Sequence, residues 1–521
     1  MEAMSSASTL PELLRQRAAA HPERLLIIHG ARRMTYGELA DAAARAAGGF
    51  ARLGVAKGDK VALLLNNRPE FLAAVFAAAE IGAVFVPVNT AFAADEVGYV
   101  LDHSEAKYLL TSAEHLPLVA KARANAPRLE RVIAIGAETG GGCLGWEEFL
   151  RGSAAPEIDI RPDDLASITY TSGTTDRPKG VMLTQFAYAF APGARARALG
   201  WTERDRALVL MPLFHVNALC HMALAMLSVG GSMVLTDKFS ASRFWDEVRE
   251  CGATTSSLMR TIPTILLSLP EKPDDADNPL RLAVALLPPE QHVRFEERFG
   301  LVACGSYSLT EDILSVLGPP DKSARKLGSC GLPAAPDVHR IKIIGDDGAE
   351  LTRGKLGEIV KQSPAIMQGY YKNPAATAAV IEDGWLHTGD LGYVDEDGFL
   401  FFVDRKKDMI KRGDENISAE EVERVLNSHP EVAESAVFGV PDPIRQEELK
   451  ACVVLKPRAN DVGADAIWSH CAERLAAFKV PRYIEFVAEL PKTPSSKVQK
   501  HLLRGAGGGI VFDRSARQNR R

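Results

Sequence analysis

The sequence predicts an α/β protein: a large N-terminal domain of helix-covered, mainly parallel sheets, a β-rich subdomain and a small α+β C-terminal domain. Up to Phe299, short apolar segments alternate with helical segments, a pattern typical of a parallel sheet covered by helices. From about Lys326 the segments shorten and turn residues become frequent, which favours β structure. The charged run Asp404 to Asp408 then precedes a last stretch with its own helices and strands.

The N-terminal elements alternate along the chain. A helix is expected over Leu10 to Ala20 and a strand over Arg24 to His29, and a second helix, capped by Thr35, ends near Gly54. The next strands and helices are expected at Lys60 to Leu65, Pro69 to Ile81, Ala83 to Val88, Ala94 to Asp102, Ala106 to Thr111 and Leu165 to Tyr170. This repetition indicates parallel strands joined by helices.

The second half continues the pattern and then changes it. Further elements are expected at Ala207 to Met211, Ala218 to Leu227, Ser232 to Leu235, Ser242 to Cys251, Arg281 to Leu287 and Pro289 to Phe299. The β-rich region, about 326–403, carries hairpin signals at Gly345 to Gly348 and Asp395 to Gly398. We therefore expect an N-terminal domain over 1–403, a junction over 404–408 and a C-terminal domain over 409–521.

Composition excludes several classes of function. The 521 residues carry a net charge of −6, so no nucleic-acid partner is expected. The seven cysteines are scattered without a C-x-x-C pair, which fits a reducing compartment and argues against structural zinc. No secretory signal is evident, and Glu80 and Pro87 interrupt the most apolar stretch, Phe71 to Val88, so no integral membrane segment is expected. We expect a cytoplasmic protein, and no pattern indicates its oligomeric state.

One stretch has the composition of an anion-binding loop. Tyr170 to Gly180 reads Tyr-Thr-Ser-Gly-Thr-Thr-Asp-Arg-Pro-Lys-Gly, and we expect it to be a loop that leaves a strand. Its hydroxyls can donate hydrogen bonds, its glycine allows close backbone approach, and its lysine adds a charge suited to a polyphosphate. The candidate residues are Thr171, Ser172, Gly173, Thr174, Thr175 and Lys179. The residues alone leave open a kinase, a transferase, a ligase or a polar surface turn.

This loop resembles the phosphate loop of the adenylate-forming superfamily, which includes acyl-CoA synthetases, luciferases and the adenylation domains of peptide synthetases. Nearly the whole chain shares the resemblance, because further motifs follow in that family's order and spacing. They are Met211 to His215, Tyr307 to Glu311, Gly357-Glu358 with Gly369 to Tyr371, Trp385 to Asp390, Asp404 to Asp408 and Pro491 to Lys497. The chain is most similar to CoA ligases, and Lys238 to Ala241, Phe244-Trp245 and the short Arg281 to Glu290 segment are similar to the crotonobetaine/carnitine-CoA ligase branch.

The resemblance implies an ATP-dependent acid:CoA ligase, that is, an acyl-CoA synthetase. A small-molecule carboxylic acid would attack the α-phosphate of ATP and release pyrophosphate. The thiol of coenzyme A would then attack the acyl-adenylate and release AMP. ATP, Mg²⁺ and coenzyme A are thus implied, and the first step needs positioning and charge neutralisation rather than a protein nucleophile.

The family's catalytic residues carry over onto two charged positions. Lys497, in a Thr-Pro-Ser-x-Lys context, would bridge the carboxylate and the α-phosphate. Glu311 would hold Mg²⁺, with Thr310 beside it, because this hard cation prefers carboxylate and phosphate oxygens. From the residues alone, a solvated lysine and a helix-capping Thr-Glu pair remain alternatives.

The nucleotide would be held by residues from three motifs. Asp390 resembles the ribose ligand, and Arg405 would add a charge-assisted contact. Tyr307 would stack on adenine, and Ser306 before it belongs to the same predicted site. An ordinary core tyrosine is the alternative for Tyr307.

The resemblance also places an acyl pocket. His215 matches a histidine or aromatic gate that lies against the carboxylate, with no proton transfer assigned to it, and a buried structural histidine is the alternative. Val216, Gly305 and Leu309 are expected to line the same pocket.

A mobile C-terminal domain would alternate between the two steps. Lys407 matches the family's hinge residue, and the charged run around it suits a rotating joint because exposed polar backbone can change conformation without opening a core. The first pose would present Lys497, and the second would place Gly413 beside the pantetheine tunnel.

Several positions depart from the family pattern. Asp414 and Ser496 stand where glycine is usual, Ser308 replaces the glycine of Tyr-Gly-x-Thr-Glu, and Gln185 stands where histidine is frequent. A non-glycine residue at a position that needs positive φ costs about 1 kcal/mol or more. Two alternatives to the CoA ligase follow: an adenylating enzyme that serves a carrier protein or another nucleophile, and a turnover-impaired nucleotide-binding relative.

Overall fold

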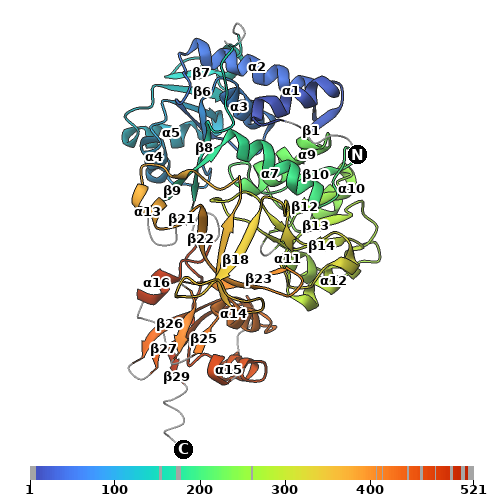
Figure 1. Ribbon diagram of the computed structural model, residues 1–521, viewed down its shortest axis with the longest axis vertical. Coiled ribbons are helices and arrows are strands. Elements are labelled where there is room, and N and C mark those ends of the chain that lie inside the picture. Colours follow the sequence, from blue (N-terminus) through green and yellow to red (C-terminus); the bar gives the residue numbers. More distant parts are fainter. Residues whose placement is uncertain are drawn as a thin grey trace, which may run out of the picture.

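The protein is elongated, with the N-terminal sheets at one end and the C-terminal domain at the other (Figure 1). The computed structural model describes residues 7–151, 155, 157–171, 178–259, 262–406, 408–412, 415–442, 445–457, 462–475, 477–492, 497–505 and 511–513. Strands of the β-rich region lie between the two ends (Figure 1). The α/β fold class predicted from the sequence is confirmed.

The first large sheet has eight strands. They are β3 (Lys60–Leu64), β4 (Val84–Pro87), β5 (Tyr108–Ser112), β6 (Arg131–Ile135), β7 (Cys143–Gly145), β8 (Leu165–Thr171), β9 (Lys179–Thr184) and β20 (Gly369–Tyr370). Their order is β20-β9-β8-β4-β3-β5-β6-β7. β8 and β9 pair antiparallel, as do β9 and β20, whereas the other pairs are parallel. The predicted phosphate loop therefore joins the two strands of a hairpin.

The second large sheet has seven strands. They are β1 (Leu25–His29), β2 (Arg32–Thr35), β10 (Arg206–Val209), β11 (Ser232–Leu235), β12 (Thr255–Ser257), β13 (Leu282–Val284) and β14 (Val302–Cys304). The order is β14-β13-β12-β10-β11-β1-β2, and only the β1–β2 hairpin is antiparallel. The mainly parallel character predicted from the alternation is confirmed.

Helices cover both sheets. The α-helices are α1 (Leu10–Ala20), α2 (Tyr36–Arg52), α3 (Pro69–Glu80), α4 (Ala94–His103), α5 (Leu116–Ala122), α6 (Trp146–Phe149), α7 (Gln185–Ala198), α8 (Val216–Ala218), α9 (Ala225–Ser228), α10 (Phe244–Cys251), α11 (Ile262–Ser268), α12 (Pro289–Phe299) and α13 (Pro374–Ala378). Short 3₁₀ helices are η1 (Ala113–His115), η2 (Arg123–Asn125) and η4 (Lys322–Ala324), and η3 (Leu219–Leu224) is a π-helix. The helix expected over Ala218 to Leu227 is thus interrupted by a π segment.

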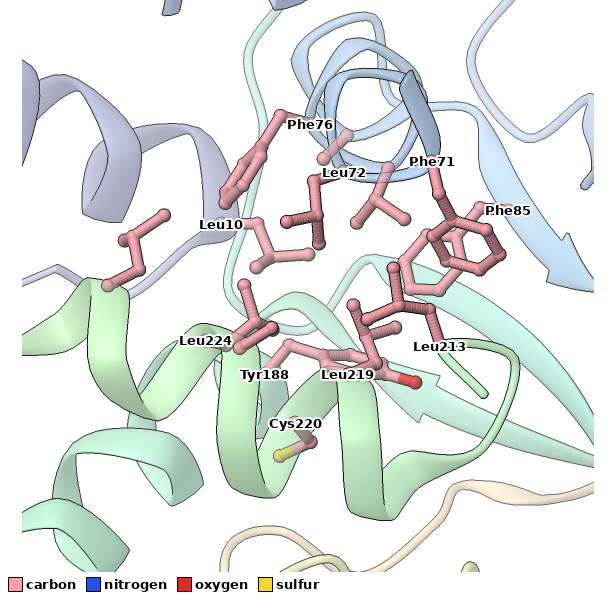
Figure 2. Packing of buried hydrophobic residues seen from close by; sticks show 14 of the residues in the cluster. Leu10, Phe71, Leu72, Phe76, Phe85, Tyr188, Leu213, Leu219, Cys220 and Leu224 are labelled. Carbon is pink, nitrogen blue, oxygen red and sulfur yellow. The ribbon is translucent and has the colours of Figure 1, made fainter. Parts of the chain in front are cut away.

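The main core takes side chains from both large sheets and from α1, α2, α3, α7 and η3. Phe71, Leu72 and Phe76 of α3 lie opposite Leu219 and Leu224 of η3 (Figure 2). All five are at most 1% exposed, and burying each such side chain contributes about 1.5–3 kcal/mol. This core packs the helix that connects β3 and β4, two central strands of the first sheet, against the helices that follow β10.

The predicted cap at the N-terminus of α2 is present. Thr35 accepts the Glu38 N–H at 3.2 Å through its hydroxyl, and the Glu38 carboxylate accepts the Thr35 N–H at 2.7 Å. This reciprocal pair satisfies two N–H groups that the first turn of a helix leaves open.

Short strands form the β-rich region. They are β15 (Ser306–Tyr307), β16 (Val316–Leu317), β17 (Leu332–Pro333), β18 (Arg340–Ile344), β19 (Gly357–Gln362), β21 (Ile381–Glu382), β22 (Trp385–Val394) and β23 (Leu400–Arg405). β15, β16 and β17 form one sheet, and β18-β19-β22-β21 form another in which β23 also pairs with β22. The hairpin predicted at Asp395 to Gly398 is confirmed, because the Gly398 N–H donates to the Asp395 carbonyl at 3.0 Å between β22 and β23.

The C-terminal residues form a separate six-stranded sheet. Its elements are β24 (Ile410–Arg412), β25 (Glu415–Ile417), α14 (Ala419–Asn427), β26 (Val432–Asp442), β27 (Gln446–Leu455), α15 (Ala464–Ala472), η5 (Ala477–Lys479), β28 (Tyr483–Phe486), α16 (Lys500–Gly505) and β29 (Val511–Asp513). The strands run β25-β24-β27-β28-β29, with β26 paired to β27. The domain has its own hydrophobic core, so it can pack as a unit.

Candidate active site

Three residues form what we call the nucleotide wall: Tyr307 on β15, Asp390 on β22 and Arg405 on β23. The Tyr307 hydroxyl donates to Asp390 Oδ2 at 2.8 Å. Arg405 Nε lies 3.2 Å from Asp390 Oδ1. Asp390 and Arg405 face each other in the β22–β23 register, so strand pairing sets this geometry. Three residues predicted for the nucleotide site are thus brought together.

Asp390 keeps an open acceptor atom. The residue is 2% exposed, and its Oδ1 accepts no hydrogen bond from any residue that the structure describes. Burial raises the pKa of this carboxyl, while Arg405, the Tyr307 hydroxyl and Lys497 oppose the shift and Glu311 adds to it. Its Oδ1 has the Arg405 ion pair at 3.2 Å but no hydrogen-bond donor among the described residues, so this oxygen keeps the capacity to accept a hydroxyl from a ligand.

Tyr307 is largely enclosed by protein. It is 8% exposed, its ring stacks on Phe402 with centroids 6.2 Å apart, and Lys361 Nζ lies 5.6 Å from its centroid. Burial and the charge of Asp390 raise its pKa, so the hydroxyl remains a donor. Its role in adenine stacking stays a prediction. Phe402 is a contact that the sequence did not point to, because it depends on the β22–β23 hairpin. Ser306, beside Tyr307 in β15, pairs with Leu317 of β16.

The adjacent residues Glu311 and Asp312 differ in burial and in the side chains that they contact. Glu311 is half-buried, and its Oε1 accepts the Tyr370 hydroxyl at 2.9 Å. Asp312 is fully buried, with its Oδ2 2.9 Å from Lys361 Nζ and its Oδ1 accepting the Ser363 hydroxyl at 2.8 Å. Lys361 and the other partners hold the pKa of Asp312 below its usual value despite burial. Glu311 is therefore the carboxylate of this pair that can face a ligand, and Thr310 beside it is half-buried.

The ends of the predicted phosphate loop are anchored from α4. Tyr170 donates or accepts a hydrogen bond with His103 Nδ1 at 2.8 Å, and the Tyr99 hydroxyl donates to the Pro178 carbonyl at 3.2 Å. Thr171 pairs with Lys179 across the β8–β9 hairpin. The predicted ligands Ser172, Gly173, Thr174 and Thr175 lie outside the described residues. Lys179 is exposed, with its Nζ 5.1 Å from the Tyr370 ring centroid.

The predicted acyl-pocket residues lie at the C-terminal ends of strands in the second sheet. His215 precedes α8 and packs its ring on Phe214 with centroids 4.5 Å apart, and Val216 begins the helix. Gly305 follows β14, and a Cβ there would lie 2.2 Å from the Ser329 carbonyl oxygen, so close backbone packing requires glycine. Leu309 contacts both the main core and the Tyr307 cluster.

A polar pair lies next to His215. The Asn217 side-chain amide donates to the Ser257 hydroxyl at 3.0 Å, which links α8 to the end of β12. No sequence signal marks this contact, because Asn217 on α8 and Ser257 on β12 lie 40 residues apart and meet only in the fold.

The C-terminal domain contacts β23 through Asp404, beside the wall residue Arg405, and we call the contacts of Asp404 with Ser418 and Glu420 the junction. Asp404 Oδ2 accepts the Ser418 hydroxyl at 2.9 Å and the Glu420 N–H at 3.2 Å, at the N-terminus of α14. Lys497 is half-buried, and its positive charge lowers the pKa of Asp390. The predicted hinge residue Lys407 and the predicted tunnel residue Gly413 lie outside the described residues.

The described part of the chain contains neither a preformed metal cluster nor a membrane-spanning helix. No group of three or more His, Cys, Asp or Glu side chains there could hold a metal ion. No described helix is long and apolar enough to cross a membrane. A metal at this site would therefore depend on Glu311 and on oxygens of a ligand.

Together, these features bring a buried Tyr307–Asp390–Arg405 set and the half-buried Glu311 carboxylate into an arrangement typical of nucleotide-binding proteins. The AMP-binding enzyme family matches residues 14–371, and its C-terminal domain family matches residues 421–497. A crotonobetaine/carnitine–CoA ligase of Salmonella heidelberg (strain SL476) is 36% identical over 486 residues, covering 91% of this chain and 93% of the relative.

Solved structures agree with these matches. The anthranilate CoA ligase AuaEII in complex with anthranoyl-AMP has a TM-score of 0.86 at 29% identity, covering 95% of this chain and 96% of that chain. The O-succinylbenzoate CoA synthetase of Bacillus subtilis, in complex with ATP and magnesium ion, has a TM-score of 0.82 at 33% identity, covering 94% and 99%. The chain belongs to the AMP-binding enzyme family, and it is an acyl-CoA synthetase that joins an acid to CoA through an acyl-adenylate.

Proposed function

We propose that the nucleotide wall and Lys497 carry out the adenylation of a small carboxylic acid, and that the C-terminal domain here has the pose for that first step. The observation that carries the proposal is the geometry of the wall, in which the Tyr307 hydroxyl donates to Asp390 at 2.8 Å and Arg405 Nε lies 3.2 Å from the same carboxylate. The charge of Lys497 also acts on this carboxylate, as the smallest of the effects on its pKa. A lysine at this place can lie between the incoming carboxylate and the α-phosphate and neutralise both. Its contribution is electrostatic stabilisation of the charge that develops in the transition state.

The wall would bind the nucleoside part of ATP. Asp390 Oδ1, which has no hydrogen-bond donor among the described residues, would accept a ribose hydroxyl, and Arg405 would hold the carboxylate in its charged form. Lys179, at the start of β9, would contact the phosphates. The acid's carboxylate oxygen then attacks the α-phosphorus, and the bond to the β-phosphate oxygen breaks, so pyrophosphate leaves with the bonding electrons.

Magnesium fits the donors that the site offers. Mg²⁺ is commonly bound through one or two carboxylates together with substrate phosphates. Glu311 is one half-buried carboxylate, and Tyr370 contacts both it and Lys179. When bound, the ion would neutralise charge on the phosphates. Glu311 would hold it, and the Tyr370 hydroxyl would keep the Glu311 carboxylate in place.

The second step would need a different pose of the C-terminal domain. The CoA thiol attacks the acyl carbon of the adenylate, loses its proton to solvent, and AMP departs. A rotation about Lys407 would remove Lys497 and bring Gly413 toward the thiol. The junction between Asp404 and Ser418 would have to open during this rotation.

The proposed acceptor is coenzyme A and the proposed compartment is the cytoplasm. All seven cysteines are free, which fits a reducing compartment. The acids of the compared proteins are crotonobetaine or carnitine, anthranilate and O-succinylbenzoate. They share a carboxylate on a small organic scaffold, so a panel of such acids is the natural starting point for assays.

The test is acid-dependent AMP formation. The purified protein with ATP, Mg²⁺ and CoA is given trimethylammonium acids, aromatic acids and aliphatic acids from short and branched to medium length, and AMP and acyl-CoA are quantified. We expect one group to yield both products in equal amounts. A protein that binds ATP but forms no AMP with any acid would contradict the proposal. Faster transfer to a phosphopantetheine carrier protein than to CoA would overturn the proposed acceptor.

A further inference from the structure

Tyr370 lies between two charged side chains of the site. Its hydroxyl donates to Glu311 Oε1 at 2.9 Å, and Lys179 Nζ lies 5.1 Å from its ring centroid. The residue is 7% exposed. The sequence motif containing Tyr370 assigned it no role, although its side chain contacts both Glu311 and Lys179.

The backbone around Tyr370 is held from two sides. β20 pairs with β9, with Tyr370 opposite Val181, and the Tyr370 N–H donates to Thr377 Oγ1 at 2.8 Å. Gly369 has a φ of 141°, and a Cβ there would lie 2.7 Å from the Thr377 side chain, so glycine is required at this approach. The phenol is therefore presented to Glu311 from a fixed strand rather than from a loop.

The phenol and the ring of Tyr370 serve different neighbours. The hydroxyl donates to Glu311 Oε1 and leaves Oε2 outside this hydrogen bond. The ring supports the Lys179 ammonium by a cation–π contact, which holds the cation near the carboxylate.

The placement separates two groups that would otherwise attract each other. A carboxylate and an ammonium at close range form an ion pair, and such a pair would have to break before a metal ion and phosphates could bind. No ion pair joins Glu311 and Lys179 within the described part of the chain. Tyr370 occupies one Glu311 oxygen and lies under Lys179, so it satisfies both groups without joining them.

We propose that Tyr370 is a positioning residue that keeps Glu311 oriented toward a divalent cation and Lys179 oriented toward the phosphates. The proposal rests on the proposed function, because it takes Glu311 as the residue that holds Mg²⁺. Hydrogen-bonding partners of metal-binding carboxylates set the orientation of the ligand, and their loss typically weakens metal affinity or activity by about 10- to 100-fold.

The test compares Tyr370→Phe with Tyr371→Phe. Tyr371 is the next residue, and its hydroxyl donates to Glu105 Oε2 at 2.6 Å, outside the site. Both variants remove one buried or half-buried phenol oxygen and leave the ring. Mn²⁺, as a paramagnetic substitute for Mg²⁺, is titrated by electron paramagnetic resonance in the presence of a nonhydrolysable ATP analogue, and thermal unfolding is recorded without ligands.

We expect Tyr370→Phe to bind Mn²⁺ about 10-fold more weakly, whereas Tyr371→Phe binds it as the wild type does. The KM for Mg·ATP should rise more in Tyr370→Phe than kcat falls at saturating Mg²⁺. Unchanged Mn²⁺ affinity in Tyr370→Phe, or equal loss in both variants, would overturn the positioning role. A purely structural tyrosine would lower the unfolding temperature and leave the affinity of the folded protein unchanged.

Two controls keep the outcome interpretable. If Tyr370→Phe does not fold, Thr377→Val removes the acceptor of the Tyr370 N–H and leaves the phenol, and weaker Mn²⁺ binding is expected there too. Full affinity in Thr377→Val would then count against the proposal. Absence of Mn²⁺–nucleotide binding by the wild type would instead overturn the proposed function, on which this role depends.

Discussion

The nucleotide wall and the domain junction place two carboxylates on the same strand pair, yet the two are satisfied differently. Asp390 on β22 is 2% exposed and its Oδ1 accepts no hydrogen bond from the described residues. Asp404 on β23 is 5% exposed, and it accepts hydrogen bonds from its neighbour's N–H and from two groups at the start of α14. An open buried acceptor suits a ligand, whereas a filled one suits a contact between domains.

The difference between Asp390 and Asp404 indicates that one hairpin carries both a ligand-binding surface and a contact with the C-terminal domain. The wall keeps its geometry through strand pairing and side-chain contacts within the N-terminal domain. The junction depends on a few hydrogen bonds that a rotation of the C-terminal domain can break. Variants at the wall should therefore change binding and chemistry, whereas variants at the junction should change the balance between the two steps.

The largest effect is expected for Lys497→Ala. Removing the charge that stabilises the adenylation transition state should lower acid-dependent exchange between ATP and pyrophosphate by about 10²- to 10³-fold. Exchange is measured without CoA, so only the first step contributes. Lys492→Ala, which removes a nearby lysine paired with Glu434, is the matched control and should retain most of the exchange. Similar losses in both variants would show that Lys497 has no special part.

Asp390→Asn should have the next largest effect. Loss of a charged acceptor should weaken AMP binding by about 10- to 100-fold, as expected from hydrogen bonds worth about 1.5–3 kcal/mol. The matched control is Asp397→Asn in the exposed turn between β22 and β23, which should bind AMP as the wild type does. Calorimetric titration gives both affinities, and equal affinities in all three proteins would remove Asp390 from the site.

The raised pKa of Asp390 predicts that AMP affinity depends on pH. Burial raises the pKa of Asp390, so the carboxylate becomes protonated at a higher pH than an ordinary aspartate. AMP affinity should fall as pH decreases through this raised pKa, because the protonated acid loses its charge and one acceptor. In Asp390→Asn the affinity should be low and should lack this pH dependence. An identical slope in variant and wild type would assign the titration to another group.

A smaller effect is expected at the junction. Asp404→Ala removes a negative charge and two acceptor contacts at the N-terminus of α14, an interaction worth about 0.3–1 kcal/mol. The first step should slow by about two- to fivefold, and thioester formation from supplied adenylate should quicken by a similar factor. In a double-mutant cycle with Ser418→Ala the two effects should not add, because both remove the same contact. Additive effects, or equal slowing of both steps, would contradict a pose-dependent junction.

The smallest effect is expected from restoring glycine at two departures. Asp414→Gly and Ser496→Gly, each made singly, should raise turnover by no more than about fivefold, since about 1 kcal/mol for one left-handed residue corresponds to that factor. Both positions lie outside the described residues. A rise of several orders of magnitude would instead support the turnover-impaired reading of this chain.

Local patterns predicted much of the fold because they depend on neighbours in sequence. Thr35 and Glu38 form the expected cap, and the alternating segments form the expected mainly parallel sheets. The β8–β9 hairpin is not predicted by the sequence, because no turn residue within the mostly apolar run from Val181 to Ala191 marks where a strand ends and a helix begins. In the structure Thr184 ends the strand and caps α7, so strand and helix share that run.

In the site, too, the sequence predicted individual residues but not the contacts that depend on the fold. Tyr307, Asp390 and Arg405 were predicted from motifs, and the strands bring them together. The contacts of Tyr370 and Asp404 could not be predicted, because each partner lies far away in the chain and meets it only through sheet pairing or domain packing. Sequence motifs indicated which residues matter, whereas the division between ligand and junction carboxylates required the fold.

The most direct measurement of the central claim is a single-turnover reaction of Lys497→Ala with supplied acyl-adenylate and CoA. If the wall and Lys497 serve only the first step, thioester formation should proceed at close to the wild-type rate although adenylation by the same variant is lost. A loss of thioester formation as large as the loss of adenylation would contradict the division of the two steps between two poses.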